Sequence, residues 1–456
     1  MRDLVCSPSS RVRFRANIKL SNELDEKLCG SQINQKPITL QGVLLQNRRE
    51  LKVIDLFAGA GGMGLGFLSA NRKTSGYRVI GVAEIDPIYL SSLSKNYTNF
   101  AKSRDLKVNE CSPSSFEPID LTKTVDRLKI VDAVNKEGGL DILIGGSPCQ
   151  GFSQANRNSW SPDNPFNKLV EYFIKCAEEL TPKVVLMENV QGILWTNRKT
   201  NSKKEVTVAD HVSKRLTQAG YVLFPAVLDA AWYGVPQHRN RFFLLALHKS
   251  LGYAEKDFGE WGAFPIPTHG YFGENGYVTV RQAISDLPVI ENGESRLLQE
   301  YTEPSLKKLS QDEFLKQMRY LSGRMIEGHV VSNQADYVIE RYKNVPEGGN
   351  WKDIRHMMTN YTDIERTHSN IYRRLKWDEP SITIGNYRKS MIIHPSQNRG
   401  LSLREAARLQ SLPDWFTFSN STNANATGGL VHKQQQLANA VSFLLTESIA
   451  KHILNF

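Results

Sequence analysis

Short apolar segments that alternate with longer helical stretches limit most strongly what this chain can fold into. Each segment has the length of a buried strand, and several end at a glycine or a carboxylate. Strands and helices that alternate in this way form a mostly parallel sheet. We therefore predict an α/β fold with helices on both faces of the sheet. The predicted strands span residues 52–56, 78–83, 141–144, 184–187, 221–228 and 241–247.

The α/β rhythm stops after about Leu247, and this change predicts the domain organisation. Residues 251–387 are richer in Gly, Pro and charge, and we expect them to form a second, smaller and irregular domain. Residues 49–250 and 388–456 would together form the sheet domain, while residues 1–48 form a polar extension. In the last segment we expect helices at 403–409 and 433–454, the second because its apolar residues recur at helical spacing.

Composition limits the class of protein. The chain has 456 residues, of which 40% are hydrophobic, and we find neither an apolar run of membrane-spanning length nor a signal peptide. Five cysteines without C-x-x-C spacing favour a reducing compartment, and we expect a cytoplasmic protein with no metal site. The net charge of +10 suggests a polyanionic partner. Basic residues beside aromatic ones, as in Tyr372-Arg373-Arg374, suit a nucleic-acid groove, although a solvated surface has the same pattern.

A glycine-rich turn follows the first predicted strand. Gly59-x-Gly61-x-x-Gly64 opens a predicted helix, and Glu84 and Asp86 end the next strand. Glycines let a ligand approach the backbone closely, and a carboxylate at the end of the second strand can accept hydrogen bonds from ribose hydroxyls. The pattern predicts an adenosine-containing cofactor without specifying which one. A tight turn that binds no ligand is the alternative interpretation.

Cys149 is the best candidate for a nucleophile. It lies in the loop Gly145–Ser153, directly after a predicted buried strand, where α/β proteins build their sites. A thiolate held there is free to attack a substrate, whereas a structural cysteine belongs inside an apolar run. Glu188 ends another strand at the same edge of the sheet, so its carboxyl group is placed to protonate or hydrogen-bond a substrate.

Two arginines precede the last predicted strand of the sheet. In Gln237-x-Arg239-x-Arg241 the alternate residues of an extended segment point to one face. The two guanidinium groups would therefore converge, and they can bind a phosphate or a base oxygen. An edge strand that alternates polar and apolar residues is the alternative.

These and several further segments resemble the motifs of the cytosine-C5 DNA methyltransferase family. They follow the family's order over nearly the whole chain. The chain departs from the family at Ala438 and Ser442, where Gly and Pro are usual. The matching segments are Asp55–Gly62, Glu84–Asp86, Asp120-Leu121, Pro148–Gln150, Glu188–Val190, Gln237–Arg241, Arg404–Gln410 and Asn439–Val441.

The resemblance implies a Rossmann-like sheet, a target-recognition domain and the cofactor S-adenosyl-L-methionine. It places Phe57 near the methionine part of the cofactor, Glu84 on its ribose, Ile85 on one face of its adenine and Asp120 on the adenine amine. The cofactor residues that we expect are Asp55, Phe57, Gly59, Gly61, Glu84, Ile85, Asp120, Pro148 and Asn439.

The resemblance also implies the reaction. Cys149 would add to C6 of a cytosine flipped out of duplex DNA, Glu188 would bind the ring, and Arg239 and Arg241 would orient the base. We expect a monomer that protects host DNA, with a restriction endonuclease of the same specificity as a possible companion. The DNA contacts that we expect are made by Gln150, Ser153, Gln237, Arg373 and Arg374.

Three other interpretations stay open at this point. An RNA cytosine methyltransferase of the same architecture is the nearest alternative, although the long stretch 251–387 favours DNA. A nicotinamide-dependent oxidoreductase would have the same glycine turn, but it gives no reason for the cysteine and arginine motifs together. A catalytically inactive DNA-binding relative would not need Cys149, Glu188 and both arginines.

Overall fold

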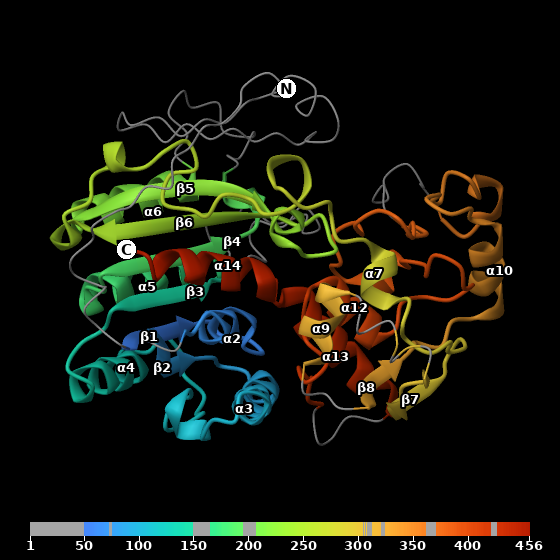
Figure 1. Cartoon of the computed structure of the whole chain (residues 1–456), viewed down its shortest axis with the longest axis horizontal. Coiled ribbons are helices and arrows are strands. Elements are labelled where there is room, and N and C mark those ends of the chain that lie inside the picture. Colours follow the sequence, from blue (N-terminus) through green and yellow to red (C-terminus); the bar gives the residue numbers. More distant parts are fainter. Residues whose placement is uncertain are drawn as a thin grey trace.

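The computed structural model describes residues 50–72, 75–148, 165–194, 207–303, 312–320, 324–361, 371–420 and 426–456, together with Ser305 and Lys307. The predicted residues Cys149, Gln150 and Ser153 lie outside the described part of the chain. In Figure 1 the described elements form a sheet domain at one side and a smaller lobe at the other.

A six-stranded sheet with the order β2-β1-β3-β4-β6-β5 forms the centre of the sheet domain. β6 runs antiparallel to both of its neighbours, and the other pairs are parallel. Each strand overlaps one of the apolar segments predicted from the sequence, so the predicted α/β fold is confirmed. The strands are β1 (Glu50–Leu56), β2 (Gly76–Ala83), β3 (Ile142–Gly146), β4 (Val184–Asn189), β5 (Tyr221–Asp229) and β6 (Asn240–His248).

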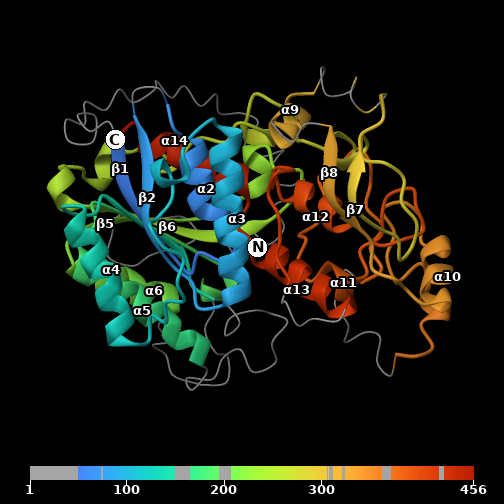
Figure 2. The same ribbon diagram turned by 90° about the horizontal axis from the view of Figure 1, so that it is seen from below.

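Helices cover both faces of this sheet because successive strand residues point to opposite sides. In β3, Ile142 and Ile144 belong to one apolar cluster and Leu143 to the other. The first face carries α2 (Gly62–Ser69), α3 (Pro87–Ser103) and α14 (Phe443–Ile453), and the second carries α4 (Thr124–Lys136), α5 (Pro165–Leu180) and α6 (Val208–Gln218). Figure 2 shows α4, α5 and α6 on the opposite side of the sheet from α2 and α14.

The smaller lobe is built from short helices around a two-stranded antiparallel sheet. Its apolar cluster includes Tyr342, Trp351 and Tyr372, all of them buried. The elements are α7 (Val280–Ile284), β7 (Ser295–Glu300), α9 (Glu313–Arg319), β8 (Met325–Val330), α10 (Asp336–Asn344), α11 (Tyr387–Ser390), α12 (Leu403–Leu409) and α13 (Ala426–Asn439).

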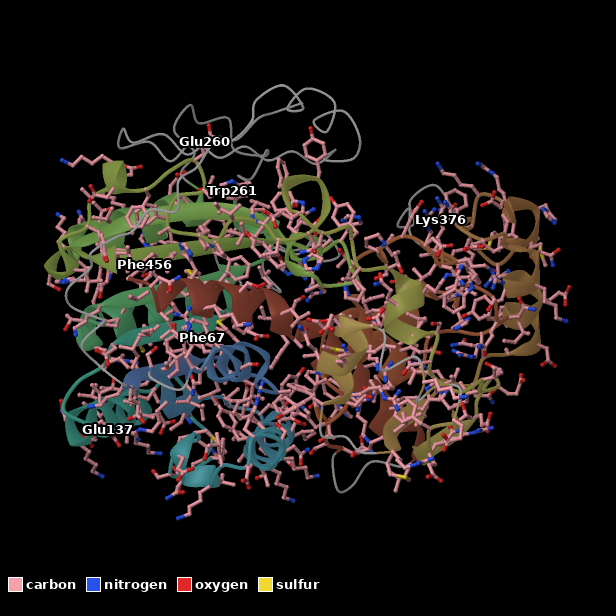
Figure 3. All side chains as sticks on the ribbon, viewed as in Figure 1. Phe67, Glu137, Glu260, Trp261, Lys376 and Phe456 are labelled. Atoms are coloured by element: carbon pink, nitrogen blue, oxygen red, sulfur yellow. The ribbon has the colours of Figure 1, made fainter. Side chains whose placement is uncertain are left out.

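The structure places the two borders between the lobes differently from our expectation. Trp261 and Phe272, expected in the second domain, pack edge-to-face with Trp232 beside β5. At the other border, α12 packs against β8, α7 and α13, so residues beyond 388 still belong to the smaller lobe. The chain returns with α14, which packs along α2; Phe67 and Phe456 lie beside it in Figure 3.

The prediction of one helix over residues 433–454 is wrong. α13 ends at Asn439, and α14 begins at Phe443 with Ser442 as its N-cap in extended conformation. Arg239 donates hydrogen bonds to the carbonyl oxygens of Ala438 and Ala440, which would otherwise accept from the next turn of a continuous helix. A contact from the segment directly before β6 therefore stabilises the break in the helix, although the apolar spacing continues through it.

Candidate functional site

The glycine turn between β1 and α2 has the conformation that a close-fitting ligand requires. Gly59 and Gly61 have φ values of 58° and 98°, and Phe57 is also left-handed at 56°. An added Cβ on Gly61 would lie 2.8 Å from Cδ1 of Leu93, whereas on Gly59 it would meet only Tyr89, at 3.8 Å. The turn is thus packed tightly on the protein side at Gly61 and is more open at Gly59.

Glu84 joins the end of β2 to this turn. Its Oε2 accepts a hydrogen bond from the backbone N–H of Gly59 at 2.9 Å, and its Oε1 accepts from Ile85 and Asp86 at 2.9 Å each. Burial raises the pKa of Glu84 despite these bonds. Ile85 is 57% exposed, so its apolar side chain is available to a flat ring. Glu84 therefore shapes the glycine turn, and its contact with a ribose stays a prediction.

Asp55 and Asp120 are the two other carboxylates that we predicted to bind the cofactor. Asp55 is buried at the end of β1 and accepts a hydrogen bond from the N–H of Gly64 in α2 at 3.1 Å, and burial raises its pKa to about 8. Asp120 accepts from the backbone and hydroxyl of Thr122, and the hydroxyl bond contributes most to lowering its pKa. The neighbouring N–H of Ile119 donates to the carbonyl of Glu84, which keeps Asp120 at the same edge of the sheet.

Asn439 reaches the same region from the end of α13. Its Nδ2 donates to the hydroxyl of Tyr89 at 3.0 Å. The backbone of the following linker is close to the turn, since an added Cβ on Gly62 would lie 2.7 Å from the carbonyl oxygen of Val441. A glycine cradle, a strand-end carboxylate, an exposed apolar side chain and an amide therefore surround one place, and this donor set fits S-adenosylmethionine.

The second part of the site lies at the ends of β3 and β4. Gly146 pairs with Glu188 in the parallel register of these strands. Asn189 is buried, and its Nδ2 donates to the carbonyl and hydroxyl oxygens of Ser147 at 3.3 and 3.1 Å. The backbone is thereby fixed just before Pro148, the last described residue ahead of Cys149.

Glu188 forms an ion pair with Arg241 across β4 and β6, with Oε1 and Nε 3.3 Å apart. Burial raises the pKa of Glu188, while the charges of Arg241 and Arg239 act in the opposite direction. A carboxyl group with a raised pKa holds its proton more readily, so it can donate as well as accept hydrogen bonds. The Nη1 of Arg241 donates to the carbonyl oxygen of Asn240, which fixes the guanidinium beside the carboxyl group.

Arg239 and Gln237 have different surroundings from Arg241. Arg239 is buried and donates to the carbonyl oxygens of Ile384, Ala438 and Ala440. Gln237 is fully buried, with its amide bound to the carbonyl of Leu409 and the N–H of Ile384. The DNA contact predicted for Gln237 is therefore wrong: the side chain ties the segment before β6 to the smaller lobe.

Of the two arginines predicted to bind DNA, Arg374 is placed elsewhere by the structure. It is 5% exposed, and its guanidinium donates to the carbonyl oxygens of Tyr342, Val345, His394 and Gln397 and to Asn398. A side chain committed in this way joins segments of the smaller lobe, so the predicted phosphate contact is wrong. Arg373 is half-buried, and its DNA contact stays a prediction.

Two residues in or near the predicted motifs make contacts that the sequence did not predict. His238 Nδ1 lies 2.8 Å from Asp229 Oδ2; burial lowers the pKa of His238, but the hydrogen bond and charge of Asp229 outweigh this and raise it. Tyr89 contacts Asn439, as described above. His238 lies inside the arginine motif and Tyr89 one turn after Asp86, yet only the fold shows their partners.

The chain matches known proteins over most of its length. A family model described as C-5 cytosine-specific DNA methylase matches residues 51–455. Type II methyltransferase M1.HphI of Haemophilus parahaemolyticus is 30% identical over 406 residues, covering 89% of this chain and 87% of that protein. Type II methyltransferase M.DdeI of Desulfomicrobium norvegicum is 29% identical over 414 residues, covering 88% of each.

Solved structures agree with the sequence matches. The crystal structure of a prophage-encoded DNA modification methyltransferase from E. coli is similar with a TM-score of 0.63 at 25% identity, covering 89% of this chain and 99% of that one. The methyltransferase EhMeth of Entamoeba histolytica shares the fold, with a TM-score of 0.50 at 13% identity and coverages of 89% and 98%. The chain belongs to the C-5 cytosine-specific DNA methylase family, and its cofactor is S-adenosyl-L-methionine.

Proposed function

We propose that this DNA cytosine-5 methyltransferase methylates a flipped-out cytosine of duplex DNA through a covalent bond between Cys149 and C6 of the base. The observation that carries the proposal is the ion pair of Glu188 and Arg241 at the strand ends beside Ser147. Cys149 follows Ser147 by two residues in the sequence. A thiol, a carboxyl group and a guanidinium from neighbouring segments are the groups that this chemistry needs.

The thiolate is required because C5 of cytosine is a poor nucleophile. When the sulfur of Cys149 adds to C6, the electrons of the C5–C6 double bond move towards C5 and the ring becomes an enamine. S-adenosylmethionine supplies an electrophilic methyl group for C5. Removal of the C5 proton, for which we propose water as the base, re-forms the double bond and releases the sulfur.

Glu188 stabilises the ring during this addition. Its carboxyl group would hydrogen-bond N3 and the exocyclic amine, and the raised pKa of Glu188 makes the protonated form, which can donate to N3, easier to reach. Arg241 holds the carboxyl group in place and keeps the surroundings of the thiolate electropositive. Arg239 would support this pair indirectly, since its described hydrogen bonds go to backbone carbonyls.

We assign the choice of DNA sequence to the smaller lobe, within residues 251–387. The residues that we propose to hold the cofactor and the reacting base lie outside this range, at one edge of the sheet and at the end of α13. Replacing residues 300–370 with the matching stretch of a relative should change the methylated site and leave cytosine-C5 chemistry intact. A chimera that keeps the original site would contradict this assignment.

We also propose a role in host protection. M1.HphI and M.DdeI are both named type II methyltransferases, and each aligns with 88–89% of this chain. Methylation of every copy of one site would then protect DNA from an endonuclease that cuts at that site.

Bisulfite sequencing of plasmid DNA from cells that express the chain tests the proposed function. We expect 5-methylcytosine at one recurring sequence, and none in cells that express Cys149→Ser. The purified plasmid should also resist an endonuclease that recognises the methylated sequence. Plasmid without 5-methylcytosine, or a Cys149→Ser variant that methylates like the wild type, would contradict the proposal.

A further inference from the structure

Tyr89 lies at the cofactor turn without a role in the motifs of the family. α3 begins directly after Glu84–Asp86, with Asp86 as its N-cap, and this places Tyr89 in the first turn of the helix. The ring lies against the glycine turn, since its Cδ1 is 3.8 Å from where a Cβ of Gly59 would be. Tyr89 is half-buried, so part of its side chain remains accessible.

The hydroxyl of Tyr89 connects two sides of the cofactor turn. It accepts a hydrogen bond of 3.0 Å from Nδ2 of Asn439, and Oδ1 of Asn439 accepts one of 3.3 Å from Gln435 in the same helix. We call this contact the Tyr89–Asn439 bridge. α3 supplies one end and α13 the other, although the two residues are 350 positions apart in the sequence.

Two parts of the sheet domain contact the end of α13 and the linker that follows Asn439. Val441 packs its carbonyl against Gly62, and Arg239 donates to the carbonyl oxygens of Ala438 and Ala440. The end of α13 is therefore fixed relative to both the glycine turn and the segment directly before β6. The bridge adds a third attachment, on the side of the turn where Glu84 lies.

Tyr89 keeps a donor for a ligand. Burial raises its pKa to about 12, opposed by the bond from Asn439 and assisted by the charges of Glu84 and Asp86, so the phenol is protonated at neutral pH. Its oxygen accepts from Asn439, and among the described residues no hydrogen bond from the phenol proton is found. A phenol can donate and accept at the same time, so this proton is available to an acceptor beside the turn.

We propose that Tyr89 is a further cofactor-positioning residue: the Tyr89–Asn439 bridge closes the cofactor site between α3 and the end of α13, and the phenol donates to an oxygen of S-adenosylmethionine. Two groups of the cofactor offer such an oxygen, the ribose and the methionine carboxylate. Glu84, whose charge acts on Tyr89, lies at the same side of the turn.

Calorimetric titration with S-adenosylhomocysteine tests the proposal without relying on turnover. Tyr89→Phe and Asn439→Ala should each weaken binding by about threefold to tenfold, the range expected for lost hydrogen bonds. Because the two side chains act together, the double variant should bind much more tightly than the product of the two single losses predicts. Tyr253→Phe is the matched control, since it removes a hydroxyl that binds the carbonyl of Phe456 away from the cofactor turn.

A second ligand identifies the oxygen. 5′-Methylthioadenosine has the ribose but not the amino-acid part, so a loss of affinity for both ligands in Tyr89→Phe indicates a ribose contact. A loss for S-adenosylhomocysteine alone indicates the carboxylate. Either result supports the proposal, and in both cases KM for S-adenosylmethionine should rise with little change in kcat.

Two results would overturn the inference. In the first, Tyr89→Phe binds both ligands as the wild type does, even if its melting temperature falls, which would leave Tyr89 a purely structural role. In the second, the losses in Tyr89→Phe and Asn439→Ala multiply in the double variant, which would show that the two residues act independently.

Discussion

Glu188 and Arg241 form an ion pair with 3.3 Å between Oε1 and Nε, although they lie on strands of opposite direction. The antiparallel pairing of β6 with β4 brings the beginning of one strand to the end of the other. A guanidinium thereby reaches the strand-end carboxyl group, which a parallel β6 would not allow at this position. The antiparallel direction of β6 therefore completes the part of the site that we propose to bind the base.

Glu188→Gln should lower kcat strongly while leaving S-adenosylhomocysteine affinity unchanged. The amide keeps the size of the side chain but loses the ion pair with Arg241 and the titratable proton. We expect a loss of roughly 100-fold to 1000-fold in kcat, as for removal of other groups that stabilise developing charge. Single-turnover methylation with a labelled methyl group measures the loss.

The same variant should change the pH profile of kcat/KM. Burial raises the pKa of Glu188, so the wild type loses the protonated form as the pH rises through that raised pKa. The glutamine side chain of the variant cannot titrate, and the corresponding fall should be missing from its profile. Equal profiles in the two enzymes would show that protonation of Glu188 plays no part.

The stability of Asp55→Asn relative to that of the wild type should increase as the pH rises. The pKa of Asp55 is raised by burial from 3.8 to about 8, so the folded state binds this proton more tightly than the unfolded state does. The wild type accordingly loses stability between about pH 4 and pH 8, and asparagine, which has no proton to lose, does not. Urea unfolding of both proteins at pH 5 and pH 8 measures the difference, and a difference that is the same at both values would contradict this assignment.

Arg374→Ala should lower the stability of the smaller lobe. It should not act by weakening a phosphate contact. Removing the guanidinium leaves several buried carbonyl groups without their donor, at a cost of about 2–4 kcal/mol. Chemical denaturation followed by tryptophan fluorescence measures the loss, and the buried Trp351 is one of the chain's seven tryptophans.

Arg373→Ala is the matched control for Arg374→Ala. Its side chain is half-buried, and we expect a stability change within about 0.5 kcal/mol. If Arg373 contacts a phosphate, its removal should reduce the salt dependence of DNA binding by about one unit of slope. Our assignment of Arg374 would be wrong if Arg374→Ala kept full stability and showed this change in slope.

The sheet was predictable from the sequence because its strands are buried on both faces. Residues such as Val184–Met187 are apolar without interruption, and no tertiary contact is needed to recognise them. The glycine turn was predictable for a similar reason, since Gly59 and Gly61 adopt backbone angles that other residues rarely adopt.

The errors arose where a distant segment decides the outcome. Arg239 donates to two carbonyl oxygens within the stretch that the apolar spacing predicts as one helix. The sequence near residue 440 does not indicate that this contact exists. Arg374 and Gln237 look like surface residues in the sequence because they are polar, but buried carbonyl groups of other segments bind them.

The central claim is that Cys149 forms a covalent bond to the target cytosine, and trapping on 5-fluorocytosine tests it most directly. Fluorine at C5 cannot leave as a proton does, so the intermediate should persist after methyl transfer. Duplex DNA with 5-fluorocytosine at the methylated position should give an adduct that survives denaturation, with peptide mass spectrometry placing the link at Cys149. Cys149→Ser should give no adduct while still binding S-adenosylhomocysteine. If the wild type methylates ordinary DNA but forms no denaturant-stable adduct with the fluorinated site, the covalent mechanism is contradicted.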